Sequence, residues 1–139
     1  MIIRGLTPIL NVSNIQQSFE WFAKLGWKKL WDWGDPPSFG CVENNRYEIF
    51  LCENCQGSRG GPMPRHVGDD DTGGVWMSWW VESPEEVDRV HTTAVKEGMN
   101  IVNPPADKPW NCREFHLRHP DGHTFRVGAG FPEDEEEEE

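Results

Sequence analysis

Two kinds of hydrophobic spacing alternate along this chain, and their order occurs twice. Short stretches in which every second residue is apolar predict β-strands, and stretches with apolar residues three or four positions apart predict amphipathic helices. The first half predicts a strand at residues 6–12, a helix at 15–25 and strands at 27–33, 39–43 and 47–52. The second half predicts a strand at 75–82, a helix at 84–97 and strands at 99–102, 112–118 and 124–129. We therefore predict an α+β chain of two tandem βαβββ modules packed together.

Local signals support these elements. Ser13 or Asn14 can accept hydrogen bonds at the start of the first helix, and Ser83 can do so for the second. A glycine follows each helix and is suited to end it. The Asn44-Asn45 pair suits a tight turn between two antiparallel strands.

The most informative stretch is the last predicted hairpin, residues 113–127, which turns at Pro-Asp-Gly, residues 120–122. Its apolar side chains point to one face, and its polar side chains point to the other. The polar set is Glu114, His116, Arg118, Thr124 and Arg126. Such a face is either exposed to solvent, as in an ordinary half-exposed hairpin, or it lines a polar pocket. The pattern alone leaves both interpretations open.

Composition limits the classes of partner. The chain has 139 residues and a formal net charge of −11, but seven of its 24 acidic side chains lie in the tail at residues 133–139. No basic stripe is present, so we predict no nucleic-acid partner. No apolar run reaches membrane-spanning length and the first residues lack a signal peptide, so we predict no membrane and a cytoplasmic location.

The spacing of the cysteines is compatible with more than one role. Cys52 and Cys55 have the separation of a metal knuckle or a redox pair, although no second pair completes a zinc site. In a reducing compartment we expect these two cysteines, like Cys41 and Cys112, to be free thiols. The Gly- and Pro-rich connection that follows, residues 56–74, is long enough to be a mobile linker or a functional flap.

The order of these elements resembles the vicinal oxygen chelate superfamily, which includes glyoxalase I, extradiol dioxygenases and bleomycin-resistance proteins. The resemblance covers nearly the whole chain and is closest to the bleomycin-resistance branch. Its carriers are the stretches Thr-Pro-Ile-Leu-Asn-Val at 7–12, Ser-Phe-Glu-Trp-Phe at 18–22, Leu-Gly-Trp at 25–27, Ser-Pro-Glu-Glu at 83–86 and the hairpin at 113–127. The resemblance implies that the two modules curl their mixed sheets into a cup, with the helices outside and the ligand inside. It also implies a homodimer.

The resemblance further implies where a metal would bind. Enzymes of the superfamily hold a divalent cation with four inward side chains, and the matching positions here are Thr7, Glu48, Trp76 and Arg126. Only Glu48 is a donor of the required kind, since an indole offers no lone pair and a guanidinium brings positive charge. We therefore predict neither a metal nor another cofactor, and no catalytic residue.

The interior of such a cup would be rich in tryptophan. The expected ligand-binding residues are Thr7, Asn11, Trp31, Glu48, Trp76, Ser78, Trp80, Trp110, Glu114, His116 and Arg126. Flat indoles suit a planar or cationic ligand through stacking and cation–π contact. Each residue also has a structural alternative. The indoles can belong to the core, Glu114 and Arg118 can pair with Arg126 across the hairpin, and His116 can be a structural histidine.

These observations favour a metal-independent small-molecule binding protein that resembles bleomycin-resistance proteins and sequesters an aromatic or cationic ligand. The main alternative is a metal-dependent, glyoxalase-like lyase or isomerase, or a dioxygenase. A third is an interaction module that uses the long loop and the acidic tail. We expect one domain over residues 1–131, with modules at about 4–55 and 75–131, followed by a disordered acidic tail at 132–139.

Overall fold

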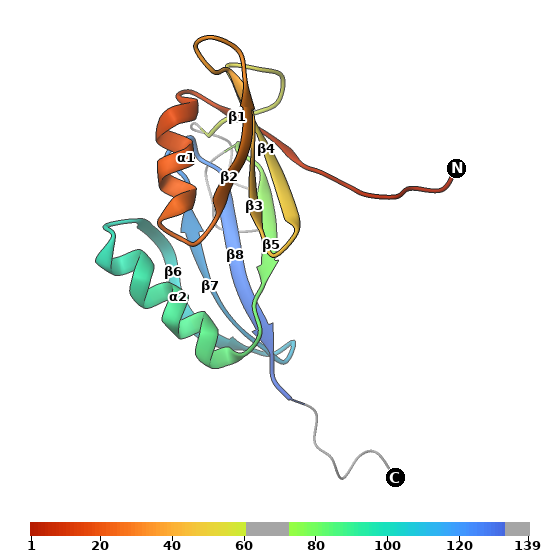
Figure 1. Ribbon diagram of the computed structural model, residues 1–139. Coiled ribbons are helices and arrows are strands. Elements are labelled where there is room, and N and C mark those ends of the chain that lie inside the picture. The colour runs from red at the N-terminus through yellow and green to blue at the C-terminus, as the bar shows by residue number, and fades with distance from the viewer. Residues whose placement is uncertain (61–72, 133–139) are drawn as a thin grey trace. The chain divides into compact units, whose positions relative to one another are not determined.

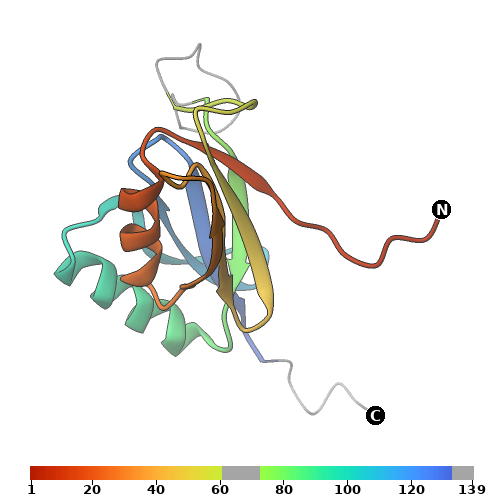
Figure 2. The same ribbon diagram turned by 45° about the horizontal axis from the view of Figure 1, so that its top comes forward.

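The computed structural model describes residues 1–60 and 73–132. Two compact units form the chain, and each holds one helix and one four-stranded mixed sheet (Figures 1 and 2). The first unit comprises residues 1–75 and 120–123, and the second comprises 76–119 and 124–139. The predicted α+β class with two βαβββ modules is confirmed. No helix in the described part of the chain is long and apolar enough to cross a membrane.

The first unit contains β1 (Ile9–Val12), α1 (Ile15–Ala23), β2 (Lys28–Trp33), β3 (Phe39–Asn44) and β4 (Tyr47–Glu53). Its strand order is β1-β4-β3-β2, with β1 parallel to β4 and the other pairs antiparallel. Asn14 begins α1, because its side chain accepts a hydrogen bond from the Gln17 amide. Apolar side chains of the helix, among them Phe19 and Phe22, are buried with Leu10, Val42 and Leu51 of the sheet.

The second unit contains β5 (Trp76–Trp80), α2 (Pro84–Lys96), β6 (Asn100–Lys108), β7 (Cys112–Arg118) and β8 (Thr124–Gly130). Its strand order is β5-β8-β7-β6, with β5 parallel to β8. Ser83 begins α2 as expected, since its hydroxyl accepts a hydrogen bond from the Glu86 amide. The core lies between α2 and the sheet, where Val87 and Ala94 of the helix are buried with Phe115, Leu117, Phe125 and Val127.

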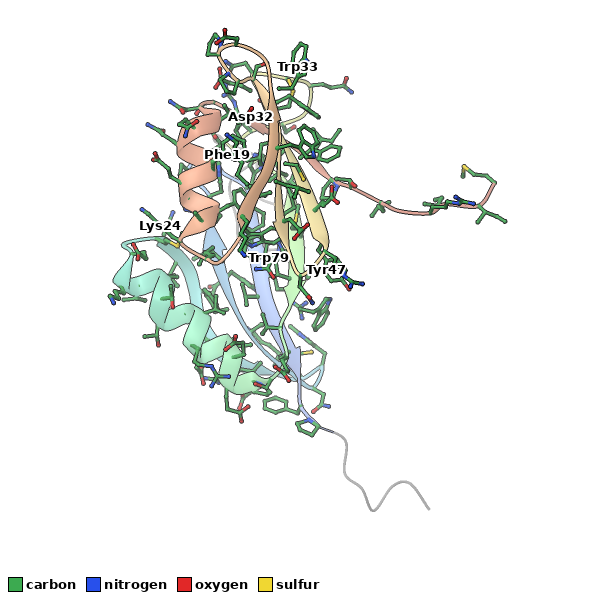
Figure 3. All side chains as sticks on the ribbon, in the orientation of Figure 1. Phe19, Lys24, Asp32, Trp33, Tyr47 and Trp79 are labelled. Atoms are coloured by element: carbon green, nitrogen blue, oxygen red, sulfur yellow. A yellow bond between two sulfur atoms is a disulfide. The ribbon has the colours of Figure 1, made fainter. Side chains whose placement is uncertain are left out.

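The alternation predicted for the last hairpin is confirmed. Phe115 lies opposite Val127 and Leu117 lies opposite Phe125, and the ring of Phe115 contacts His91 of α2 at 5.2 Å between centroids. On β5, Trp79, which is labelled in Figure 3, stacks on Phe125 with 4.3 Å between the ring centroids. The apolar face of the hairpin therefore packs under α2, and the polar face points to the other side of the sheet.

Several element boundaries differ from the sequence predictions, and three of the differences have a clear physical reason. β1 begins at Ile9 rather than residue 6, because Pro8 has no amide hydrogen to donate to the ladder. The turn after β3 has Asn45 and Arg46 at its centre, both with positive φ, as a two-residue hairpin turn requires. β6 continues to Lys108 through Pro104 and Pro105, which is tolerated because β6 is an edge strand with irregular register there.

The expectation of free thiols is wrong for one pair of cysteines. Cys52 and Cys55 form a disulfide, whereas Cys41 and Cys112 are free and buried. Asn54 adopts a left-handed conformation between the paired residues, and the chain reverses so that their Cα atoms lie 5.6 Å apart. That separation is suitable for a disulfide.

The turn at residues 120–123, which belongs to the first unit, is held within that unit by His123, which sequence analysis did not single out. The imidazole is fully buried; its Nε2 lies 2.8 Å from the Asn11 carbonyl oxygen, and its Nδ1 accepts a hydrogen bond from the Val75 amide at 3.0 Å. Because Nδ1 accepts, Nε2 carries the ring hydrogen and the side chain is neutral. Burial lowers the pKa of His123 and so favours the same form.

The single-domain assignment and its module limits remain predictions. Residues 61–72 of the predicted loop and residues 133–139 of the acidic tail lie outside the described residues.

Candidate functional site

The candidate site lies on the face of the second unit's sheet opposite α2, which we call the open face. The register places Trp76, Ser78 and Trp80 of β5 on this face, beside Arg126 of β8. Glu114 and His116 of β7 follow across the sheet, because His116 lies directly opposite Arg126. Seven of the expected ligand-binding residues thus share one surface. Hydrogen bonds, ion pairing and ring contact join six of them: Ser78, Trp80, Trp110, Glu114, His116 and Arg126. Trp76 is 69% exposed on the same face of β5.

An ion pair between Glu114 and Arg126 forms the centre of the open face. The Arg126 Nη2 atom donates to Glu114 Oε1 at 2.7 Å, and Nη1 donates to Ser78 Oγ at 3.0 Å. The Glu114 side chain is only 2% exposed, and that of Arg126 is 13% exposed. Of the pairing that sequence analysis offered as a structural alternative, the Glu114–Arg126 part is therefore present, whereas Arg118 donates to Thr124 Oγ1 at 3.5 Å.

Three donors satisfy the Glu114 carboxylate. Trp110 Nε1 donates to the same oxygen as Arg126 at 2.8 Å, and His116 Nε2 lies 2.7 Å from the other oxygen. Burial raises the pKa of Glu114, but the hydrogen bonds from Arg126, His116 and Trp110 outweigh it and bring the pKa to about 2. The pKa of Arg126 is raised by its hydrogen bond to Glu114. Both groups are therefore charged at neutral pH, and neither is free to exchange protons with a substrate.

His116 completes this network through a residue that sequence analysis missed. The Asn103 Nδ2 atom lies 2.9 Å from His116 Nδ1, and an amide nitrogen can only donate. Nδ1 is therefore the acceptor, and Nε2 carries the hydrogen that is donated to Glu114. Asn103 lies opposite His116 in the sheet, and this position could have indicated its role. The two prolines that follow Asn103 suggest a loop, so the position was not predicted.

Two exposed indoles flank the ion pair. The Arg126 guanidinium lies over the Trp80 ring, with its Cζ atom 4.9 Å from the ring centroid, and Trp110 is held by its hydrogen bond to Glu114. Trp80 is 63% exposed and Trp110 is 57% exposed. Large exposed aromatic surfaces of this kind commonly mark binding sites. One charged pair thus fixes two flat apolar surfaces that face solvent.

The remaining predicted residues belong to the first unit. Thr7 is exposed and precedes β1, and Trp31 of β2 contacts the rings of Phe39 and Phe50 at 5.6 and 5.3 Å between centroids. Asn11 is buried, and its side chain donates to the Gly57 carbonyl and accepts from the Cys55 amide. The amide of Asn11 thus holds the segment after β4, and its predicted contact with a ligand remains untested.

Glu48 lies on β4, where its Oε1 atom is 3.4 Å from the Cys41 thiol. Burial raises the pKa of Cys41 to about 12, and the hydrogen bond to Glu48 and the charge of this carboxylate act in the same direction. Cys41 is therefore a protonated thiol at neutral pH and not a nucleophile.

The side chains at the four inferred ligand positions do not fit a divalent metal. Trp76 offers no lone pair, and Arg126 is held as a cation by Glu114 and Ser78. Among residues 1–60 and 73–132, no group of three or more His, Cys, Asp or Glu side chains is arranged to hold a metal ion. Glu48 is the one position of the four with a suitable donor.

The fold and the sequence together define the class. A family model described as the Glyoxalase/Bleomycin resistance protein/Dioxygenase superfamily matches residues 5–127, and the chain belongs to this superfamily. A search of curated protein sequences found no match.

Solved structures of similar fold differ strongly from this chain in sequence. TioX from Micromonospora sp. ML1 is 18% identical with a TM-score of 0.70, over 91% of this chain and 98% of that chain. Lactoylglutathione lyase from Agrobacterium tumefaciens is 18% identical with a TM-score of 0.67, over 90% and 92%. The fosfomycin resistance protein FosX from Listeria monocytogenes is 15% identical with a TM-score of 0.67, over 94% and 95%. At these identities the similarity shows the fold alone.

Proposed function

We propose that this protein is a metal-independent small-molecule binding protein that sequesters a planar aromatic or cationic ligand, as in the bleomycin-resistance branch of its superfamily. The observation that carries the proposal is the pair of exposed indoles, Trp80 and Trp110, fixed by one buried ion pair. Indole rings contribute stacking surface at little entropic cost when they are already held in place.

The charged groups of the open face support binding rather than catalysis. Glu114 and Arg126 are both engaged, and both ring nitrogens of His116 are in contact with other side chains. A general acid or base needs a group that can exchange a proton with the substrate near the working pH. These residues are arranged to position the indoles and not to transfer protons.

The alternative, a metal-dependent lyase, isomerase or dioxygenase, needs donors at the positions matched to the family pattern. Three of these four positions carry Thr7, Trp76 and Arg126, and the donor set disfavours this alternative. A homodimer and a cytoplasmic location remain part of the proposal as predictions from the family resemblance and from the sequence.

We expect tryptophan fluorescence to change on titration with members of a panel of planar and cationic compounds that includes a bleomycin-type antibiotic. Replacing Trp80 or Trp110 by leucine should weaken binding of the best compound about fivefold to tenfold, because each indole contributes roughly 1 kcal/mol of ring contact. Calorimetry of the same variants gives affinities that do not depend on the fluorophore.

The matched control is Trp33→Leu. Trp33 is 70% exposed at the end of β2 in the first unit and is drawn in Figure 3. This variant should bind as the wild type does. A flat titration with every compound, or equal losses in all three variants, would remove the proposal.

A further inference from the structure

We infer that the ligand of the open face is a planar aromatic compound that carries an anionic group, such as an aromatic carboxylate. This inference rests on the proposed function and narrows it from planar or cationic ligands to aromatic anions. It follows from the charged side chains that the strand register places on the open face and from the contacts that each of them makes.

The open face is cationic although the whole chain is strongly acidic. The strand register places Lys108, Arg118 and Arg126 on this face, with Glu114 as the one carboxylate among the described strand residues that share it. The acidic residue of β6, Asp107, pairs with Arg113 on the side of α2, because Arg113 also donates to Asp88 of that helix. Three cations against one anion give this surface a local charge opposite to that of the chain.

The single carboxylate is not available to a ligand. Glu114 is 2% exposed and accepts hydrogen bonds from three side chains of the protein. A cationic ligand would therefore meet a buried and neutralised anion. It would also approach cations, which would repel it.

Both flanking indoles already have a cation of the chain against the ring. Arg126 lies over Trp80 at 4.9 Å, and Lys108 Nζ lies 6.0 Å from the centroid of Trp110. A second cation at either ring would stand beside a like charge. A neutral or anionic ring can stack on the exposed indole surface while its acidic group approaches these cations.

Ser78 supplies a donor at the same place. Its hydroxyl oxygen accepts a hydrogen bond from Arg126, so the hydroxyl hydrogen points elsewhere and can be donated to an acceptor. Ser78 is exposed on β5 between Trp76 and Trp80. The open face therefore combines flat apolar surface, a hydroxyl donor and positive charge.

The test uses three probes with one ring system and different charges: 2-naphthoate, 2-naphthamide and 2-naphthylmethylammonium. Calorimetric titration of the intact, chelator-treated protein at neutral pH should rank naphthoate first, naphthamide about fivefold to tenfold weaker and the ammonium compound weakest. Added salt should weaken the binding of naphthoate more than that of naphthamide.

Lys108→Gln provides the discriminating variant because Lys108 is the cation of the open face that lies against Trp110. This change should lower the affinity for naphthoate about twofold to fivefold and leave that for naphthamide unchanged. Lys96→Gln, in the last turn of α2, is the control and should change neither.

The outcomes distinguish the preference for an anionic ligand from the proposed binding function itself. Equal or tighter binding of the ammonium compound would overturn the anionic preference and leave the proposed binding function in place. Absence of binding for all three probes together with a flat panel titration would remove both.

Discussion

Replacing Glu114 by glutamine is expected to lower the free energy of unfolding by about 3 kcal/mol at neutral pH, because the change leaves Arg126 without its counter-charge. The carboxylate is buried and accepts from Arg126, His116 and Trp110. Its pKa of about 2 in the folded protein compares with 4.5 when unperturbed, and that difference also corresponds to about 3 kcal/mol. Urea denaturation followed by circular dichroism measures the effect.

The sign of the pH dependence follows from the lowered pKa of Glu114. Its stabilising contribution is fully present above pH 4.5 and is lost as the pH falls toward about 2, because the unfolded chain takes up the proton first. The Glu114→Gln variant should lack this part of the acid dependence. Asp107→Asn is the control, since the exposed pair of Asp107 and Arg113 should contribute less than about 1 kcal/mol. Equal costs for the two variants would contradict the role given to the buried pair.

Replacing His123 by alanine is expected to cost about 3 kcal/mol of stability. The change removes the partners of the Val75 amide and the Asn11 carbonyl and leaves space where a fully buried ring lay. Chemical denaturation of the variant measures the loss. A cost below about 1 kcal/mol would show that the turn at residues 120–123 is not held by this side chain.

His123 also predicts a pH dependence of stability, which arises from a buried neutral side chain, whereas that of Glu114 arises from a buried charged one. Burial lowers the pKa of this imidazole in the folded state, so its contribution is present above the unfolded value of about 6.5 and is lost as the pH falls below it. His123→Gln should have a shallower decline of stability in mildly acidic buffer than the wild type. Ser83→Ala, which removes the cap of α2 but no titrating group, should decline in parallel with the wild type.

The elements and the faces of the strands could be predicted because they depend on local spacing. Alternation along residues 113–127 separated Phe115 and Leu117 from Glu114 and His116, and the register confirms the separation. The Glu114–Arg126 pair could also be predicted, since opposite charges on neighbouring strands of one face tend to pair.

What the sequence did not predict depends on position in the sheet or on contacts distant along the chain. Asn103 was missed because Pro104 and Pro105 suggest a loop, and only the place of β6 at the sheet edge allows them in a strand. His123 contacts Asn11 across more than a hundred residues, a pairing that no local spacing signals. The Cys52–Cys55 disulfide was missed because the argument from a reducing compartment outweighed the short separation.

The family resemblance implies metal-dependent enzymes among the members of the superfamily. The central claim is therefore that this protein binds its ligand without a metal. The claim rests on Trp76 and Arg126 at two positions where a cation would need lone-pair donors, and on the indoles that flank the Arg126–Glu114 pair.

The most direct test is calorimetric titration of the best panel compound into protein stripped with a chelator, repeated after addition of Ni²⁺, Zn²⁺, Mn²⁺ or Fe²⁺. Metal analysis of the purified and the stripped protein accompanies it. We predict dissociation constants that agree within about twofold in every sample, and no stoichiometric metal before stripping. Binding that disappears on stripping and returns with one of these metals would contradict the account.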